Sequence, residues 1–189
     1  MKTYDFVHLV LHAVGGRIEG RTKLQKVVYF AGVLTDMHED LGYRAHYYGP
    51  YSSKVTAAVE ELRGLGFLEQ QRASGGQVDP QGFEVARYDY ALTDDGTKIA
   101  QEKAQLRPRM WHKVQESVTR LQRADVSDYM KLSIAAKAYF LVKRAKEPVT
   151  LDRLVQISQR FGWKVSQDQA AKASEWLKSL QLVRDEPVQ

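Results

Sequence analysis

The sequence contains no cysteine among its 189 residues. Disulfide bonds, thiolate metal ligands and cysteine nucleophiles are therefore excluded together. A chain without cysteine fits a reducing compartment, so we expect a cytoplasmic protein.

Long apolar stretches are also missing. No run approaches the roughly 18 apolar residues that a membrane-spanning helix needs. The first residues, MKTYD, lack the apolar core of a signal peptide, so we expect no membrane association. Because 43% of the residues are hydrophobic and 27% are charged, the composition favours a folded chain with one large domain or two small ones over a disordered chain.

Familiar catalytic motifs are absent as well. Neither a Walker-type phosphate loop nor a Gly-x-Gly-x-x-Gly turn occurs. Neighbouring acidic residues occur in four pairs, Glu39-Asp40, Glu60-Glu61, Asp94-Asp95 and Asp185-Glu186. Adjacent residues on a helix point about 100° apart, so such pairs are poor acid–base dyads. We therefore expect a non-enzymatic protein without a cofactor.

Two histidines have the spacing of a helical metal-binding pair. His8 and His12 are four residues apart and could face one metal ion from the same helix. No third ligand stands at motif spacing, and no His-Glu-x-x-His pattern occurs. We therefore interpret both as surface or boundary histidines and expect no metal site.

The net charge of +5 is distributed unevenly. Residues 1–106 carry 12 Lys or Arg against 14 Asp or Glu, whereas residues 107–189 carry 16 against 9. A basic half beside a slightly acidic one suggests a polyanionic partner, most often nucleic acid. The other interpretation is that the basic surplus only keeps the chain soluble.

The first half has the element order of a winged helix-turn-helix. Apolar residues at helical spacing predict helices over 5–14 and 22–34, and a third helix that begins at Ser52 or Ser53 and ends before Gly66. Strand-like runs follow at 67–72 and 83–92, with a glycine-rich tip between them. Thr93 then caps a further helix. Three helices and a hairpin predict a helix-turn-helix with a wing.

The second half predicts a similar unit. An amphipathic helix follows Pro108, and three more helices are expected after Asp125, the last two capped by Thr150 and Ser166. Residues 62–69 also resemble 177–184 at a constant offset of 115, and both stretches are expected to end a helix and begin a strand. Too few residues remain for a return strand, so the second wing would be truncated.

The predicted fold class is therefore mainly α with a small β-hairpin (α+β), built from tandem winged helix-turn-helix units. Residues 1–106 would form the N-terminal winged-helix domain, and 107–124 would be a linking amphipathic helix. Residues 125–189 would form a C-terminal winged-helix-like domain. The apolar stripe of the linking helix would either pack between the two units or make a homodimer contact.

Three motifs in the first half resemble a prokaryotic family. They are GRTKLQKVVYFA at 20–31, YYGPYS at 47–52 and YALTDDG at 90–96. Together they are similar to the YwgA-like proteins and more distantly to the Panacea antitoxin domain, which usually has valine after Gly-Pro where this chain has Tyr51. The resemblance implies a winged-helix fold over about the first 100 residues and supplies no catalytic residue.

Polar and basic residues at both predicted recognition helices are candidate contacts to DNA. The N-terminal part of such a helix enters the major groove, while flanking cations contact phosphates or the minor groove. In the first unit the candidates are Arg21, Lys23, Lys26, Ser52, Ser53, Lys54, Thr56, Arg72 and Arg87. In the second unit they are Lys164, Gln167, Gln169 and Lys172.

We therefore expect a protein that binds double-stranded DNA by sequence or by structure, most simply in transcriptional control. The alternative is an antitoxin-like adaptor that uses the winged-helix scaffold to bind a protein partner, because the first unit is slightly acidic.

Overall fold

The computed structural model describes residues 1–73, 87–125, 128–145 and 148–183. The described chain is mainly helical, with a small three-stranded antiparallel sheet, so the expected α+β class is confirmed. The predicted wing tip, the Asp185-Glu186 pair and the last residue of the internal repeat lie outside the described residues.

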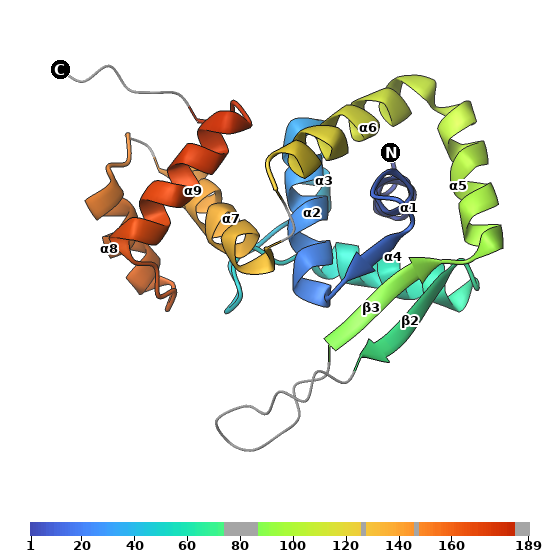
Figure 1. The fold of residues 1–189 in the computed structure, drawn as a ribbon, viewed down its shortest axis with the longest axis horizontal. Helices are drawn as coiled ribbons and strands as arrows, with labels where there is room; N and C mark the ends of the chain where they lie inside the picture. Colours follow the sequence, from blue (N-terminus) through green and yellow to red (C-terminus); the bar gives the residue numbers. More distant parts are fainter. Residues whose placement is uncertain (74–86, 126–127, 146–147, 184–189) are drawn as a thin grey trace.

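The described residues of the first half form four helices and the sheet (Figure 1). The elements are α1 (Thr3–Ala13), β1 (Arg17–Glu19), α2 (Arg21–Leu34), α3 (His38–Leu41), α4 (Ser53–Gly64), β2 (Leu68–Ala73) and β3 (Arg87–Leu92). Strand β3 lies in the middle, because Tyr90 is aligned with Ile18 of β1 on one side and with Gln70 of β2 on the other. The short elements β1 and α3 were not predicted.

The second half is helical throughout its described residues. It contains α5 (Asp94–Leu106), α6 (Pro108–Arg123), α7 (Tyr129–Arg144), α8 (Leu151–Arg160) and α9 (Gln167–Ser179). The predicted caps are confirmed, because the hydroxyl groups of Thr93, Thr150 and Ser166 each accept a hydrogen bond from a backbone N–H in the first turn. Pro108 begins α6, where its missing N–H costs nothing.

The internal repeat corresponds to two helix ends with the same geometry. After α4, the Phe67 N–H donates to the Leu62 carbonyl at 2.9 Å, and Gly66 has φ 74°. After α9, the Leu182 N–H donates to the Leu177 carbonyl at 3.0 Å, and Gln181 has φ 56°. Both ends therefore have the Schellman pattern at an offset of 115 residues. Only the first continues directly into a strand, because the described residues after α9 are not in strand conformation.

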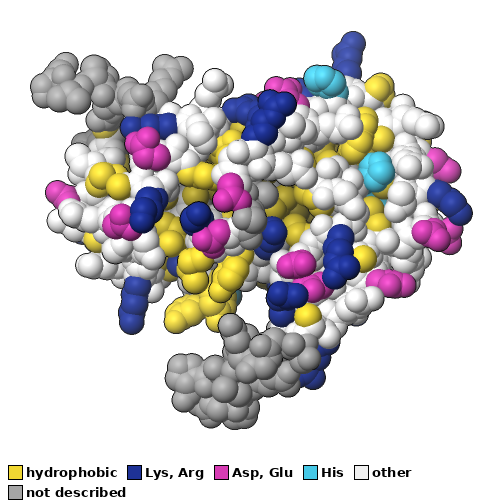
Figure 2. All heavy atoms as spheres, in the orientation of Figure 1, with side chains coloured by type: hydrophobic (Ala, Val, Ile, Leu, Met, Phe, Trp, Pro, Cys, Tyr) yellow, Lys and Arg dark blue, Asp and Glu magenta, His cyan; other side chains and the backbone are white. Residues whose placement is uncertain are grey.

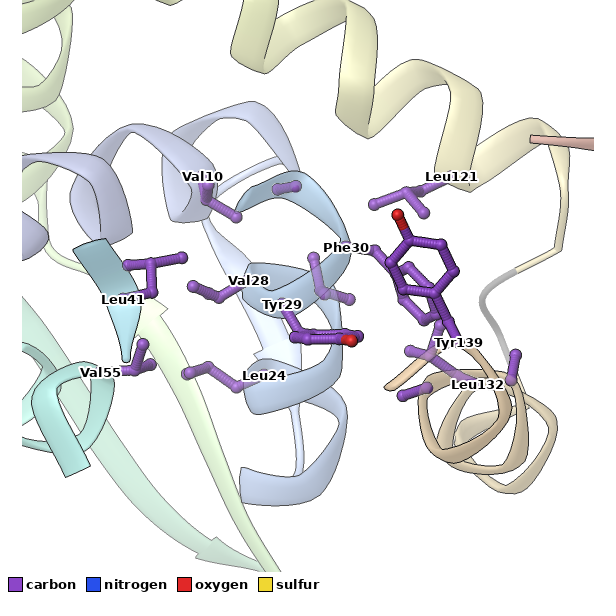
Figure 3. Close-up of a cluster of buried hydrophobic side chains, with 14 of the residues drawn as sticks. Val10, Leu24, Val28, Tyr29, Phe30, Leu41, Val55, Leu121, Leu132 and Tyr139 are labelled. Atoms are coloured by element: carbon purple, nitrogen blue, oxygen red, sulfur yellow. The ribbon is translucent and has the colours of Figure 1, made fainter. Parts of the chain in front are cut away.

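One hydrophobic core runs through both halves (Figure 3). Helix α2 lies in its centre and is buried almost all round from Leu24 to Gly32. On one side Val28 faces Leu41 of α3 and Val10 of α1. On the other side the centre of the Phe30 ring lies 6.3 Å from that of Tyr139 and 4.9 Å from that of Trp176. The predicted domain boundaries near residues 106 and 124 coincide with the ends of α5 and α6, but the hydrophobic core is continuous across both boundaries.

The apolar stripe of α6 is part of this core. Val114, Val118 and Leu121 are buried, and α6 packs on α1 and α2. These side chains are therefore covered within the chain, and the homodimer contact inferred from the stripe loses its basis. Helix α6 packs on the first half, and its end is linked to the second half where the Trp176 indole donates to the Ala124 carbonyl.

Candidate nucleic-acid interface

Helices α2 and α4 are joined by buried side chains of the first two motifs. The Gln25 amide donates to the Ser52 carbonyl at 3.0 Å, and its oxygen accepts from the Ser52 N–H at 3.1 Å. The same amide donates to Thr56 Oγ1 at 3.0 Å. The Ser52 hydroxyl accepts from the Val55 N–H and donates to the Leu41 carbonyl. These bonds hold the start of α4 at a set position on α2.

Lys26 is buried beneath the same segment. Its side chain is 2% exposed, and Nζ donates to the Pro50 carbonyl at 2.7 Å. Burial and the neighbouring charge of Lys137 lower the pKa of Lys26 to about 7. The prediction that Lys26 contacts phosphate is therefore wrong, and so is the assignment of Ser52, which is 0% exposed and caps α4.

The exposed start of α4 consists of Ser53, Lys54 and Ala57. Lys54 Nζ donates to the Asp40 carbonyl at 2.8 Å but stays at the surface. Thr56 is half-buried and donates to Tyr51 Oη at 2.8 Å, so its hydroxyl is already engaged. Of the candidates on α4, Ser53 and Lys54 are therefore the two presented to solvent.

The candidate cations beside the sheet are largely engaged with other side chains. The Arg21 guanidinium lies 4.0 Å from the centre of the Tyr88 ring, an attractive cation–π contact. Arg87 pairs with Asp89 at 3.0 Å and lies 3.9 Å from Glu19. Arg72 is exposed on β2, aligned with Tyr88 of β3, and Lys23 is half-buried in the first turn of α2. A phosphate at Arg87 would have to compete with two carboxylates.

The candidates of the second unit also have partners at the start of α9. Gln169 forms a capping box with Ser166, Gln167 donates to Asp152, and Lys172 pairs with Asp168 at 2.7 Å. Lys164 is exposed in the turn before α9. Base contacts from Gln167 or Gln169 would therefore require these local bonds to be replaced.

The segment 44–51, which we call the aromatic loop, lies between α3 and α4, is bonded by residues of the second half, and was not among the predicted DNA-contact residues. Arg44 and Tyr51 close it through two backbone hydrogen bonds of 2.9 Å. The Trp163 indole donates to the His46 carbonyl at 2.7 Å, and the Ser133 hydroxyl donates to the Tyr48 carbonyl at 3.0 Å. The start of α4 and the turn before α9 therefore approach the same loop.

The side chains of the aromatic loop point outward although its backbone is held. Tyr47 is 72% exposed and Tyr48 is 61% exposed. On the face shown in Figure 2, hydrophobic side chains project below α7, where this teal segment runs in Figure 1. The cluster of aromatic residues in YYGPY was a visible signal, but its spacing matches neither a helix nor a strand.

The segments that meet at this loop carry positive charge only. Residues 41–59, 129–145 and 153–167 contain no Asp or Glu. They contain nine basic residues, Arg44, Lys54, Lys131, Lys137, Lys143, Arg144, Arg153, Arg160 and Lys164. The first segment comes from the half with a net negative charge, and hydrogen bonds from Ser133 and Trp163 to the aromatic loop bring the other two segments to it.

His8 has a structural role instead of a surface position. It is 0% exposed, its Nε2–H donates to the Gly96 carbonyl at 2.8 Å, and Lys103 Nζ donates to its Nδ1 at 3.3 Å. Burial, with a further contribution from Lys103, lowers the pKa of His8 to about 4. His12 stacks on Trp111 at 5.1 Å. Within the described ranges, no three His, Asp or Glu side chains are grouped as a metal ion would require.

A search of family models found no match. The chain is 39% identical over 82 residues to the protein named "Uncharacterized protein YwgA" of Bacillus subtilis (strain 168). That stretch covers 43% of this chain and 45% of the relative, so the match spans less than half of either protein. The similarity to YwgA inferred from the motifs is confirmed, and that relative's name describes no activity. In the part of the chain that the structure describes, no helix is long and apolar enough to cross a membrane.

Proposed function

We propose that this protein is a non-enzymatic DNA-binding protein that acts in transcriptional control. The observation that carries the proposal is the arrangement of α2 and α4 through Gln25 and Ser52, with the start of α4 exposed and the β2–β3 hairpin following it. A helix-turn-helix presents the start of its second helix to the major groove, and a hairpin after that helix is a wing. Residues 1–106 are then a winged helix-turn-helix of the YwgA-like type.

The second half contributes charge to the same face in this proposal. Its helices α7, α8 and α9 form a winged-helix-like unit, and Lys164 lies beside the Trp163 that holds the aromatic loop. Lys54 of the first unit and Lys164 of the second would both contact phosphates. Because the cations near the loop come from both halves, DNA would be bound by the two units together.

Fluorescence anisotropy with labelled duplex fragments at several salt concentrations tests the proposal. If Lys54 and Lys164 neutralise phosphates, the affinity of the wild type falls steeply with salt, and each Lys→Ala change lowers the slope of log K against log salt by about 1. Lys98→Ala is the matched control, because Lys98 is exposed on α5 and pairs with Asp95. Absence of duplex binding at low salt would exclude the proposed function.

The second candidate function is an antitoxin-like adaptor that binds a protein. Glu60 and Glu61 are exposed on α4, directly beyond its proposed contact end, and a carboxylate there repels phosphate. Purification of the chain with a stoichiometric protein partner, combined with no duplex binding at low salt, would favour the adaptor over the DNA-binding protein.

A further inference from the structure

The aromatic loop is a held platform and not a loose connection. Its carbonyl groups accept from three different elements: Lys26 of α2 at Pro50, Ser133 of α7 at Tyr48, and Trp163 of the α8–α9 turn at His46. The Lys26 side chain and Pro50 are both buried. A loop bonded at alternate positions along its backbone presents its side chains at little further cost in conformational entropy.

The rings on this platform are exposed and adjacent. Tyr47 and Tyr48 lie with their ring centres 5.0 Å apart at 86°, and the His46 ring lies 6.4 Å from Tyr48 and 5.0 Å from Tyr51. Phe161 is 41% exposed, and its ring stacks on that of the buried Trp163 with the ring centres 5.1 Å apart. The same Trp163 donates a hydrogen bond to the His46 carbonyl of the loop. Apolar rings kept in water on a held backbone indicate a ligand that covers them.

The charges around the rings identify that ligand as an anion with flat apolar faces. Arg44 lies at the start of the loop, and Arg160 and Lys164 flank the Phe161–Trp163 pair, all three exposed. Of the carboxylates nearest in sequence to Arg160 and Lys164, Asp152 accepts from Gln167, and Asp168 pairs with Lys172. Nucleic acid combines phosphates for the cations with base faces for the rings. A protein partner would offer the rings apolar cover without a reason for the exposed cations Arg44, Arg160 and Lys164.

We propose that the aromatic loop binds unpaired DNA bases, which stack on Tyr47 and Tyr48 while Arg44, Arg160 and Lys164 contact the adjoining phosphates. In a fully paired duplex each base is already stacked between its neighbours and has no face for these rings. Bases in a gap, a bulge or a single strand do have one. This inference rests on the proposed DNA-binding function and specifies its target, namely DNA that is distinguished by structure.

The test measures affinity for matched oligonucleotides by fluorescence anisotropy. The probes are a fully paired duplex, the same duplex with a short single-stranded gap, and a single strand. We expect the wild type to bind the gapped duplex at least about tenfold more tightly than the paired one. The double change Tyr47→Ala with Tyr48→Ala should abolish that preference, because stacking on each ring contributes about 5- to 150-fold. Affinity for the paired duplex should change less than threefold.

Two controls separate stacking from folding. Tyr47→Phe with Tyr48→Phe keeps the rings and should keep the preference, and Leu106→Ala removes an 80% exposed apolar side chain of α5, outside the loop. Because both tyrosines are exposed, all variants should keep the wild-type melting temperature. A 2-aminopurine base placed in the gap reports stacking directly, since its fluorescence should be quenched by the wild type and by the Phe variant but not by the Ala variant.

The outcomes distinguish a failure of the proposed role of the aromatic loop from a failure of the proposed DNA-binding function. Equal affinity of the wild type for gapped and paired duplexes, or an Ala variant with an unchanged preference, would overturn the role of the aromatic loop and leave duplex binding intact. Absence of binding to every probe at low salt would overturn the DNA-binding function itself, and the rings would then be assigned to a protein partner.

Discussion

Gln25 and Ser52 exchange two hydrogen bonds, one in each direction, although 27 residues separate them in the sequence. Gln25 is 6% exposed and Ser52 is 0% exposed, so water cannot replace either bond. The glutamine of the LQK motif therefore satisfies the backbone of the residue that caps α4. This pair gives the two motifs a structural role in joining α2 to the start of α4.

Replacement of Gln25 by Ala should destabilise the protein by about 2–4 kcal/mol, because the Ser52 N–H and carbonyl become buried without partners. Urea denaturation at pH 7.5 measures the change. Gln101→Ala, on an exposed face of α5, is the matched control and should cost less than about 0.5 kcal/mol. A loss below about 1 kcal/mol for Gln25→Ala would show that Ser52 is held by other contacts.

Gly96→Ala should be strongly destabilising, by about 3 kcal/mol or more. A Cβ on Gly96 would lie 2.0 Å from the Phe67 carbonyl oxygen, a backbone atom that cannot move without shifting β2. Gly64 is the control, because it is helical and a Cβ there meets no atom within 4 Å. Gly64→Ala should stabilise the protein by about 0.5–1 kcal/mol, and thermal melts of the two variants should therefore shift in opposite directions.

Lys26 should make stability rise between pH 7 and pH 9. Burial lowers its pKa to about 7 in the folded protein, whereas an unfolded lysine titrates near 10.4. Above pH 7 the unfolded state therefore binds the extra proton, and the free energy of unfolding increases with pH. The Lys26→Met variant lacks this group, so wild type should gain about 1–2 kcal/mol relative to the variant over that range.

The control for Lys26 is Lys98→Met, whose parent side chain is exposed on α5. This variant should follow the pH profile of the wild type. Denaturation curves at pH 7, 8 and 9 give the comparison, and parallel profiles for wild type and Lys26→Met would contradict the lowered pKa of Lys26.

His8 should make stability fall in the acidic range. Its folded pKa of about 4 lies below the unfolded value of about 6.5, because burial and then the neighbouring charge of Lys103 disfavour the protonated ring. As pH falls from 6.5 towards 4, only the unfolded state takes up the proton, and stability is lost. Between pH 6.5 and pH 4.5 wild type should lose about 2 kcal/mol more than His8→Gln, as measured by urea denaturation. Identical losses would mean that His8 can be protonated in the folded state.

Local signals predicted most of the helices and their caps. Thr93, Thr150 and Ser166 cap α5, α8 and α9 as expected, since a cap depends on a side chain and on backbone N–H groups only two or three residues away. Strand β1 was missed because three residues cannot show an alternating pattern, and its pairing with β3 lies about 70 residues further along.

The candidate site was predicted less well, because the contacts that bury or expose its residues also join segments far apart in sequence. Lys26 and Lys54 are both lysines in predicted helices next to a turn, and nothing in their neighbouring residues says which one is exposed. Lys26 is buried because the Tyr-Gly-Pro segment and α7 cover it, and Lys54 is exposed because it lies on the outer side of the first turn of α4. The partner of Gln167, Asp152, lies 15 residues away and was likewise not visible in sequence, whereas the Lys172–Asp168 pair has the i,i+4 spacing of a helical ion pair.

The sequence by itself determined that the chain lacks cysteine chemistry, where most helices begin and end, and its similarity to YwgA, because these follow from residue identity and from spacing within one or two turns. The tertiary structure alone decided which polar side chains support the fold and which face solvent. It also brought the aromatic loop of the first half together with the acid-free segments of the second half. Burial and charge clustering depend on packing between residues far apart in sequence, and no local pattern contains that information.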